Sequence, residues 1–526
     1  MTKCVLKFHA IFLVLAMLVG SGCRSDIAPE YTCIQPTPVC IQPSDVVVHV
    51  VHGEAQLLDL AVVRARPVSL VVESGSGIGR VKLVRDESRK TLKCRLQIPR
   101  GTRVRLLCGN TPISEWFDPW AIAQVPAPEA IQTPAWALGA VWYNIFPERF
   151  DNANPGNDSP GFAGTMVPWT SAWDRVSPDE IESSWNRARA DPVFFADHPA
   201  RAEAPWGDVV FERRYGGDLQ GVVRRLDHIV DMGATAIWLC PIFRSTSLHK
   251  YDAADHRHVD PMLGSPTVPG PAPAFTADPE TWGWTPADRY FLETLLPAVR
   301  THDLRLILDG VWNHVGIDHP AFSDARMRGH ESPFSAWFEL IFDQSRSPSP
   351  VIGWRSWGGR NGRLPVLRHT DDGDLAEPVA EHIFNITTRW MDPDGDGNHA
   401  DGIDGWRLDV ANEIGMHFWS RWRAHVRKVN PEAVLIGELW HDGSPYFGGR
   451  AFDAQMNYPF AYAVTAWLGR DPTYTSNQFR NDLLALYTHH PATDLAQMNL
   501  IGSHDTARAV SMLANPGFEY DRTSDS

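Results

Sequence analysis

Three carboxylates lie at the ends of strand-like runs, each close behind apolar residues. They are Asp409, Glu438 and Asp505, and a fourth run ends at Asn313 and His314. Acidic and imidazole side chains at the carboxyl ends of successive parallel strands are typical of the active site of a (β/α) barrel. Two carboxylates on either side of a sugar acetal can supply a nucleophile and a proton donor. The pattern therefore predicts cleavage of a glycosidic bond.

Alternating apolar strands and amphipathic helices are expected to position these side chains, a pattern typical of a parallel α/β fold. Residues 219–232 have their apolar side chains on one helical face and end at Gly233. Residues 316–376 form too long a connection for an ordinary loop and predict an inserted lobe after the third strand. Seven strands are expected, at residues 141–146, 235–242, 305–311, 405–410, 434–439, 452–457 and 498–502.

After the seventh strand the sequence has one helical stretch, at residues 507–514, and a polar tail. The expected catalytic fold is therefore a (β/α)8-type barrel of residues 135–526 that lacks its last strand and helix. A carboxy-terminal β-domain is not expected. An open barrel exposes edge groups that closure would pair. This opening puts turnover in question.

Short β-rich runs between residues 44 and 130 predict an N-terminal β-sandwich. Residues 24–43 are rich in proline and predict a tether. Residues 1–23 begin with a basic region and a short apolar stretch, which predicts a secretory signal. Its end resembles a bacterial lipoprotein cleavage box, so we expect export to the bacterial cell envelope and a lipid anchor at Cys23. Cleavage nearby without lipidation is the alternative.

The composition narrows the partners and the cysteine chemistry. The 526 residues carry a net charge of -15 with no long basic block, so nucleic acid is not an expected partner. The lipid anchor is the only expected membrane contact, and a homodimer is left open. Export permits disulfides; Cys94 and Cys108 could pair across a hairpin. Cys240 lies in an apolar run and is expected to be a buried thiol.

Several runs resemble, in their order and amino-acid sequence, the short motifs of the α-amylase family of retaining glycoside hydrolases. The resemblance spans roughly residues 140–508. The sequences of residues 309–314 and 406–413 are most similar to the corresponding motifs of the neopullulanase, cyclomaltodextrinase and maltogenic amylase branch. The runs are residues 216–221, 235–239, 249–252, 307–314, 405–409, 435–440, 456–460 and 501–505.

The resemblance and the residues together suggest catalytic roles. Asp409 would be the nucleophile, with its pKa lowered by a buried Arg407. Glu438 would donate the proton, with its pKa raised by partial burial. Retention requires the two carboxyl groups to lie about 5–5.5 Å apart. Asp505 would grip the sugar hydroxyls. A structural ion pair is the alternative for any one of these acids.

The resemblance also implies residues that bind substrate. His314 and His504 would hydrogen-bond the sugar in the cleaved site, and Asn313 would support the loop of His314. His249 and Tyr251 would lie beneath that sugar. For a single histidine or tyrosine, ordinary packing is the alternative. Asp309 is expected to orient Arg407.

Two stretches could bind calcium, which prefers carboxylate and amide oxygens. One resembles the calcium site of the neopullulanase branch, although Asn154 stands where an Asp is expected, and it predicts a structural calcium ion. Its residues are Asn152, Asn154, Asn157, Asp158, Gly216 and Asp218. Residues 392–398 resemble the start of an EF-hand loop, but Ile403 stands in place of the closing Glu. A solvated turn is favoured there, with calcium as the alternative.

The expected function is a retaining hydrolase of α-1,4-glucosidic bonds in maltooligosaccharides, cyclodextrins, pullulan or starch. A glucanotransferase on the same scaffold is one alternative. A surface glycan-binding protein that has lost turnover through the open barrel is the other. Residues 364–368 depart from the motif of the relatives in a segment that lines their cleft, so linkage preference is left open.

Overall fold

The computed structural model describes the strands between residues 46 and 112 together with Leu83 and Arg103, and most of the chain from residue 132 to residue 514. The ranges in the second part are 132–158, 165–172, 175–182, 210, 213–265, 272–371, 373–487 and 489–514. The predicted signal, the Cys23 anchor and the tether lie outside the described residues. The chain divides near Asp118 into two compact units.

The first unit contains two four-stranded sheets. The order in one sheet is β1-β2-β6-β5 and in the other β4-β3-β7-β8. Because β6 and β7 belong to different sheets, the hairpin expected between Cys94 and Cys108 is wrong. The packing of the sheets as a sandwich stays a prediction. The strands are β1 (Val46–His52), β2 (Leu57–Val62), β3 (Leu70–Ser74), β4 (Arg80–Lys82), β5 (Val84–Asp86), β6 (Thr91–Gln97), β7 (Val104–Cys108) and β8 (Thr111–Pro112).

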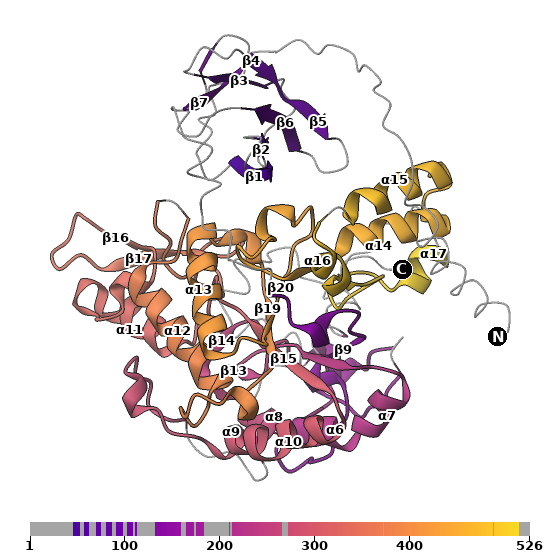
Figure 1. The fold of residues 1–526 in the computed structure, drawn as a ribbon. Helices are drawn as coiled ribbons and strands as arrows, with labels where there is room; N and C mark the ends of the chain where they lie inside the picture. Colours follow the sequence, from indigo (N-terminus) through magenta and orange to yellow (C-terminus); the bar gives the residue numbers. More distant parts are fainter. Residues whose placement is uncertain are drawn as a thin grey trace. The chain divides into compact units, whose positions relative to one another are not determined.

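The second unit is built on a parallel sheet of seven strands that neighbour one another in chain order (Figure 1). All seven predicted strands are confirmed. Most are buried along their whole length, as expected for parallel strands covered on both faces. They are β9 (Trp142–Ile145), β12 (Ala236–Leu239), β15 (Arg305–Gly310), β19 (Gly405–Leu408), β20 (Val434–Gly437), β21 (Ala454–Asn457) and β22 (Met498–Asn499).

Helices cover the outside of this sheet (Figure 1). The predicted helix at residues 219–232 is two helices, α6 and α7, because Arg225 leaves helical geometry at φ -105° and ψ 6°. Its predicted apolar face is buried. The helices are α6 (Leu219–Arg224), α7 (Leu226–Asp231), α8 (Pro261–Gly264), α9 (Pro286–Tyr290), α10 (Leu296–Thr301), α11 (Pro320–Arg328), α12 (Glu377–Met391), α13 (Met416–Val429), α14 (Tyr458–Thr465), α15 (Ser476–Leu486), α16 (Pro491–Ala496) and α17 (Ala509–Ala514).

Small sheets lie in the connections between strands of the large sheet. A hairpin, β13 (Phe243–Ser245) with β14 (Ala253–Val259), follows β12. Between β15 and α12, helix α11 is followed by an antiparallel sheet of β16 (Leu340–Phe342), β17 (Val351–Ser356) and β18 (Gly359–Arg360). None of the described helices combines the length and the apolar composition required to cross a membrane.

The two edge strands of the large sheet, β9 and β22, approach each other. The Gly139 N–H, before β9, donates to the Leu495 carbonyl, before β22, at 2.9 Å. Beyond the strands, the Phe146 and His504 rings lie 6.2 Å apart. The sheet is therefore a nearly closed barrel, and in the described part of the chain no strand stands between β22 and β9.

Candidate active site

Strand alternation determines which side chains enter the barrel. Ile307, Ile436 and Met456 pack in an inner cluster, whereas Leu308 and Leu435 pack in the cluster shared with the surrounding helices. Successive side chains of a strand point to opposite faces, so residues two positions beyond an inner residue also point inward. By this rule, the side chains of Asp309 and Glu438 point into the barrel at its carboxyl-terminal end. Arg407 and Asp409 follow because Trp406 and Leu408 face the helices.

Arg407 is the centre of the site. Its guanidinium is 0% exposed and contacts three carboxylates. Nη1 lies 2.8 Å from Asp309 Oδ1 and 2.9 Å from Asp409 Oδ1, and Nη2 lies 2.9 Å from Glu438 Oε2. Asp309, itself 0% exposed, accepts from Arg407 Nη1 through both of its oxygens, the contact expected of a residue that orients Arg407. Asp409 and Glu438 are thereby held around one cation.

One guanidinium cannot neutralise three buried carboxylates. Burial raises the pKa of Asp309 to about 6, against the opposing charge of Arg407. Burial and the neighbouring carboxylates also raise the pKa of Asp409, although Arg407 acts to lower it. The expectation that Arg407 would set a low pKa for Asp409 is therefore wrong in the free protein. Interacting groups of this kind share their protons, so the cluster titrates as a unit and not as separate acids.

Glu438 is held through both of its oxygens. Oε2 accepts a hydrogen bond from the Val410 N–H at 2.8 Å, and Oε1 accepts one from Trp440 Nε1 at 3.2 Å. Val410 adopts φ 39°, which is strained for a β-branched residue. The Trp440 ring stacks on Tyr458 at 3.9 Å. Sequence reasoning assigned no role to Trp440 or Val410, although both lie in motif runs.

A hydrogen-bonded chain lies beside this cluster. Tyr251 Oη donates to Asp309 Oδ2 at 3.0 Å and lies 2.9 Å from His504 Nε2. Burial lowers the pKa of His504 to about 3, so the ring is neutral. Because Tyr251 Oη donates to Asp309, its oxygen can accept a hydrogen bond from the Nε2–H tautomer of His504. Asp505 lies 3.3 Å from His504 and its side chain is 41% exposed. Burial and the Glu438 charge raise the pKa of Asp505 to about 6.

His314 lies on the side of the site next to the inserted lobe, the segment between β15 and α12. Its ring stacks on Trp357 at 5.6 Å, and Asn313 Nδ2 lies 3.3 Å from Nδ1. The Asn313 carbonyl accepts from the Leu367 N–H at 3.0 Å, which ties this loop to the lobe. Burial lowers the pKa of His314 to about 4, and its Nε2 has no partner among the described residues. That buried nitrogen therefore makes no hydrogen bond within the described part of the free protein.

Three further residues lie beside Tyr251, Asp309 and His504. His249 Nδ1 accepts from the Tyr251 N–H at 3.1 Å. Trp238 Nε1 donates to Asp309 Oδ2 at 3.2 Å, a role that the sequence did not predict. Cys240 is a buried free thiol, as predicted. Burial raises its pKa to about 12, so the thiol stays protonated.

Removing the central cation has a predictable effect on stability. In Arg407→Met, three buried carboxylates lose their countercharge, and the free energy of unfolding at pH 7 is expected to fall by about 3–5 kcal/mol. A buried carboxylate with a raised folded-state pKa is compatible with the fold while it is protonated. The folded protein loses stability as the pH rises through that pKa. The loss should therefore be much smaller at pH 5. Chemical denaturation followed by tryptophan fluorescence measures both values.

Two controls accompany this variant. Adding Asp309→Asn to Arg407→Met should recover part of the loss at pH 7, because one buried charge disappears. Arg289→Met, whose parent side chain is 58% exposed, should leave stability unchanged. An equal loss at pH 5 and pH 7 for Arg407→Met would show that packing, not charge, explains its effect.

The family model for "Alpha amylase, catalytic domain" matches residues 144–267 and 287–525. The chain belongs to the α-amylase family. A cyclomaltodextrinase of Geobacillus thermopakistaniensis is 31% identical over 389 residues, which cover 73% of this chain and 52% of that protein. Neopullulanase 2 of Thermoactinomyces vulgaris is 33% identical, over 74% of this chain and 54% of that protein.

Solved structures of the same family agree. A cyclic α-maltosyl-(1→6)-maltose hydrolase from Arthrobacter globiformis has a TM-score of 0.53 at 28% identity, covering 73% of this chain and 69% of that one. A debranching enzyme from Nostoc punctiforme has a TM-score of 0.51 at 28% identity, covering 73% of this chain and 70% of that one. The chain spans about half the length of the curated relatives that it matches.

The six residues predicted to bind calcium lie together in this α-amylase family member. Asn152 Oδ1 and Asn157 Oδ1 are buried without a hydrogen-bond partner among the described residues. Asn152 Nδ2 donates to Asp158 Oδ2 at 2.9 Å. A side chain at Gly216 would collide with Asn152 and Asp158, so the backbone comes close to both. The two unpaired amide oxygens, with the Asp158 carboxylate, are of the kind that calcium prefers as ligands.

Two of the six residues are mainly structural. Asp218 caps α6 by accepting from the Gly221 N–H at 2.6 Å, and it also accepts from the Asn154 N–H at 2.8 Å. Asn154 Oδ1 accepts from the Gly156 N–H at 3.2 Å. The oxygens best placed for an ion are therefore those of Asn152, Asn157 and Asp158.

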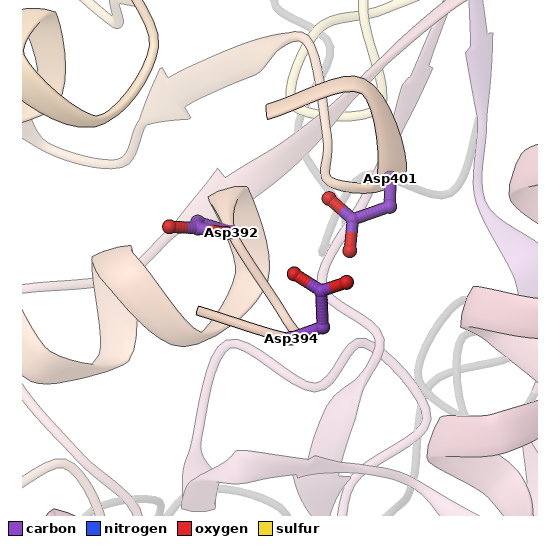
Figure 2. Close-up of side chains that lie close together, drawn as sticks. All are labelled: Asp392, Asp394 and Asp401. Carbon is purple, nitrogen blue, oxygen red and sulfur yellow. The ribbon is translucent and has the colours of Figure 1, made fainter. Parts of the chain in front are cut away.

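The second acidic stretch forms a small cluster after α12. Carboxylate oxygens of Asp392, Asp394 and Asp401 lie within 4.8 Å of one another (Figure 2). Asp401 and Asp394 face each other, and Asp394 is exposed. Asp392 and Asp394 also cap turns of their own loop, accepting from the Gly397 and Asp396 N–H groups. These bonds are those of a solvated acidic turn, and calcium stays the alternative.

Proposed function

We propose that the protein is a retaining glycoside hydrolase that cleaves α-1,4-glucosidic bonds in maltooligosaccharides, cyclodextrins, pullulan or starch. The observation that carries the proposal is the placement of Asp409 and Glu438 around Arg407 at the carboxyl end of the barrel. The names of the relatives, a cyclomaltodextrinase and a neopullulanase, support the α-glucan class.

The first step needs an ionised nucleophile and a protonated acid. Asp409 attacks the anomeric carbon as a carboxylate, and Arg407 stabilises that charge. Glu438 gives its proton to the leaving oxygen and later takes one from water. Oε2 accepts from the Val410 N–H at 2.8 Å and lies 2.9 Å from Arg407 Nη2, whereas Oε1 accepts only the longer bond from Trp440 Nε1 at 3.2 Å, so the mobile proton belongs on Oε1.

The remaining groups hold the sugar as its ring distorts toward an oxocarbenium ion. Asp505 accepts hydrogen bonds from ring hydroxyls. His314 and His504 are neutral, because burial lowers the pKa of each, so they act as hydrogen-bond partners rather than cations. Tyr251, fixed by Asp309 and supported by His249, forms the floor beneath the sugar.

Incubation of the purified chain with maltotriose, β-cyclodextrin and pullulan tests the proposal. We expect release of reducing sugar, and proton NMR should show the α-anomer as the first product. Products longer than maltotriose at high substrate concentration would instead identify a glucanotransferase. Binding of these glucans without any product would identify a glycan-binding protein and contradict the proposal.

We also propose a structural calcium ion held by Asn152, Asn157 and Asp158. A ligand that binds only the folded state raises the unfolding temperature. Removal of calcium with a chelator should therefore lower the thermal unfolding midpoint, and added calcium should restore it. Asp158→Asn should reduce this response, whereas Asp394→Asn should retain it. A response lost in Asp394→Asn alone would place the ion at the acidic turn after α12 instead.

We propose, from the sequence, that the protein is exported and lipid-anchored at Cys23. Two lipid chains suffice for stable membrane attachment. Metabolic labelling with a palmitate analogue should mark the wild type and leave Cys23→Ser unlabelled. Equal labelling of both proteins would contradict the anchor.

A further inference from the structure

A pocket of about 700 Å³ lies beside the loop that follows β9; its lining includes Asn152 and Asp158 of the proposed calcium site but none of the residues assigned to catalysis. Its walls include Phe150, Trp169 and Tyr215, together with Asp151, Arg225 and His228. This volume lies in the range of small-molecule binding sites, about 300–1,000 Å³. The pocket combines an aromatic side with a polar side.

The aromatic wall is exposed and built on a fixed backbone. Trp169 is 65% exposed and meets Tyr215 edge-on at 5.1 Å. Strands β10 (Thr165–Met166) and β11 (Arg213–Arg214) pair with each other; Tyr215 follows β11 directly, and Trp169 lies three positions after the end of β10. Arg213, 1% exposed, anchors the wall by donating to the Ala172 carbonyl at 2.7 Å and to Glu180 at 2.6 Å. The aromatic platform is therefore preformed.

The polar wall does not attract an anion, because its lining includes the carboxylates of Asp151 and Asp158 and its one lining guanidinium, Arg225, is paired with Asp151. Asp151 contacts Arg224 at 2.7 Å and Arg225 at 2.9 Å, so both guanidinium groups already have a carboxylate partner. A phosphate or carboxylate ligand would have to compete with Asp151 for these cations. A neutral ligand with many hydroxyl groups can instead use Asp151 and the exposed His228 as they stand.

We propose that this pocket, between Trp169 and His228, is a second binding site for a glucosyl unit of an α-glucan, separate from the cleavage site. The apolar face of a pyranose ring would lie on the exposed face of Trp169, because aromatic side chains combine a large apolar surface with low conformational entropy. Its hydroxyls would bond to the polar wall. The identity of the sugar as a glucan unit rests on the proposed function.

Calorimetric titration of Glu438→Gln with maltotriose tests the site without turnover, in the presence of calcium. We expect two binding events per chain. Adding Trp169→Ala should weaken one event by roughly tenfold or more, a loss of about 1.4 kcal/mol per factor of ten. Adding Trp169→Tyr should restore most of that loss, because a smaller ring still offers a flat face. Far-UV circular dichroism and thermal unfolding confirm that each variant is folded.

Trp467→Ala is the matched control, since Trp467 is another exposed tryptophan, 39% exposed, outside the pocket. It should leave both events unchanged. Unchanged binding in Trp169→Ala, or a single event that Trp169→Ala does not affect, overturns the second site and leaves the proposed hydrolysis intact. Loss of all maltotriose binding in Trp169→Ala supports the pocket and counts against the proposed function, because no glucan would then bind at the catalytic cluster.

Discussion

Hydrolysis of maltotriose is expected to fall by roughly 10⁴-fold or more in Asp409→Asn, a loss of the size seen when a nucleophile is removed. An amide has the same shape as the carboxylate but cannot attack the anomeric carbon. The fold should not suffer. Because burial and two neighbouring carboxylates raise the pKa of Asp409, removal of its charge relieves repulsion around Arg407. The thermal unfolding midpoint should therefore stay equal or rise at pH 7.

Asp227→Asn is the matched control, because the Asp227 side chain is 94% exposed and far along the sequence from the site. It should keep full activity. A mechanism-based fluorinated glucoside should label the wild type at Asp409, and peptide mass spectrometry identifies the modified residue. Hydrolysis that survives in Asp409→Asn, or a label on another carboxylate, would remove Asp409 as the nucleophile.

The second large effect is expected in Glu438→Gln. General acid–base catalysis contributes about 10²–10⁴-fold, so maltotriose hydrolysis should fall within that range. Formation of the glycosyl-enzyme from glucosyl fluoride should be nearly unaffected, because fluoride leaves without a proton. The second step still lacks its base, so the covalent intermediate should accumulate. Single-turnover kinetics with both substrates measures the difference.

Added azide provides a sharper test of the same residue. Azide needs no general base, so it should release the stalled intermediate and give an α-glucosyl azide, which NMR identifies. Glu293→Gln, whose parent side chain is 64% exposed, should behave as wild type and form no azide product. An equal rate loss for glucosyl fluoride and maltotriose in Glu438→Gln would mean that the residue orients substrate and does not transfer the proton.

Much of the site could be predicted from the sequence because strand geometry is local. The alternation of side chains along a strand places Asp309, Arg407 and Glu438 on the inner face of the barrel whatever their neighbours are. All seven strands of the large sheet formed where apolar runs predicted them. The buried thiol of Cys240 followed from its apolar surroundings in the same way.

Contacts between distant parts of the chain could not be predicted in this way. The break at Arg225 and the assignment of β6 and β7 to different sheets depend on packing that no local pattern encodes. The pKa of Asp409 depends on a balance between burial and one shared cation, and only the assembled cluster shows that burial prevails.

The sequence by itself determined the family, the parallel barrel and the carboxylates at its strand ends, because short motifs and the two-residue period of a strand are local properties. Only the tertiary structure decided how those groups are held. Trp238 and Tyr251 reach Asp309 from residues 71 and 58 positions away in the chain. Trp169 and Tyr215 likewise meet only after the chain has folded, since side-chain contact across such separations is a property of packing.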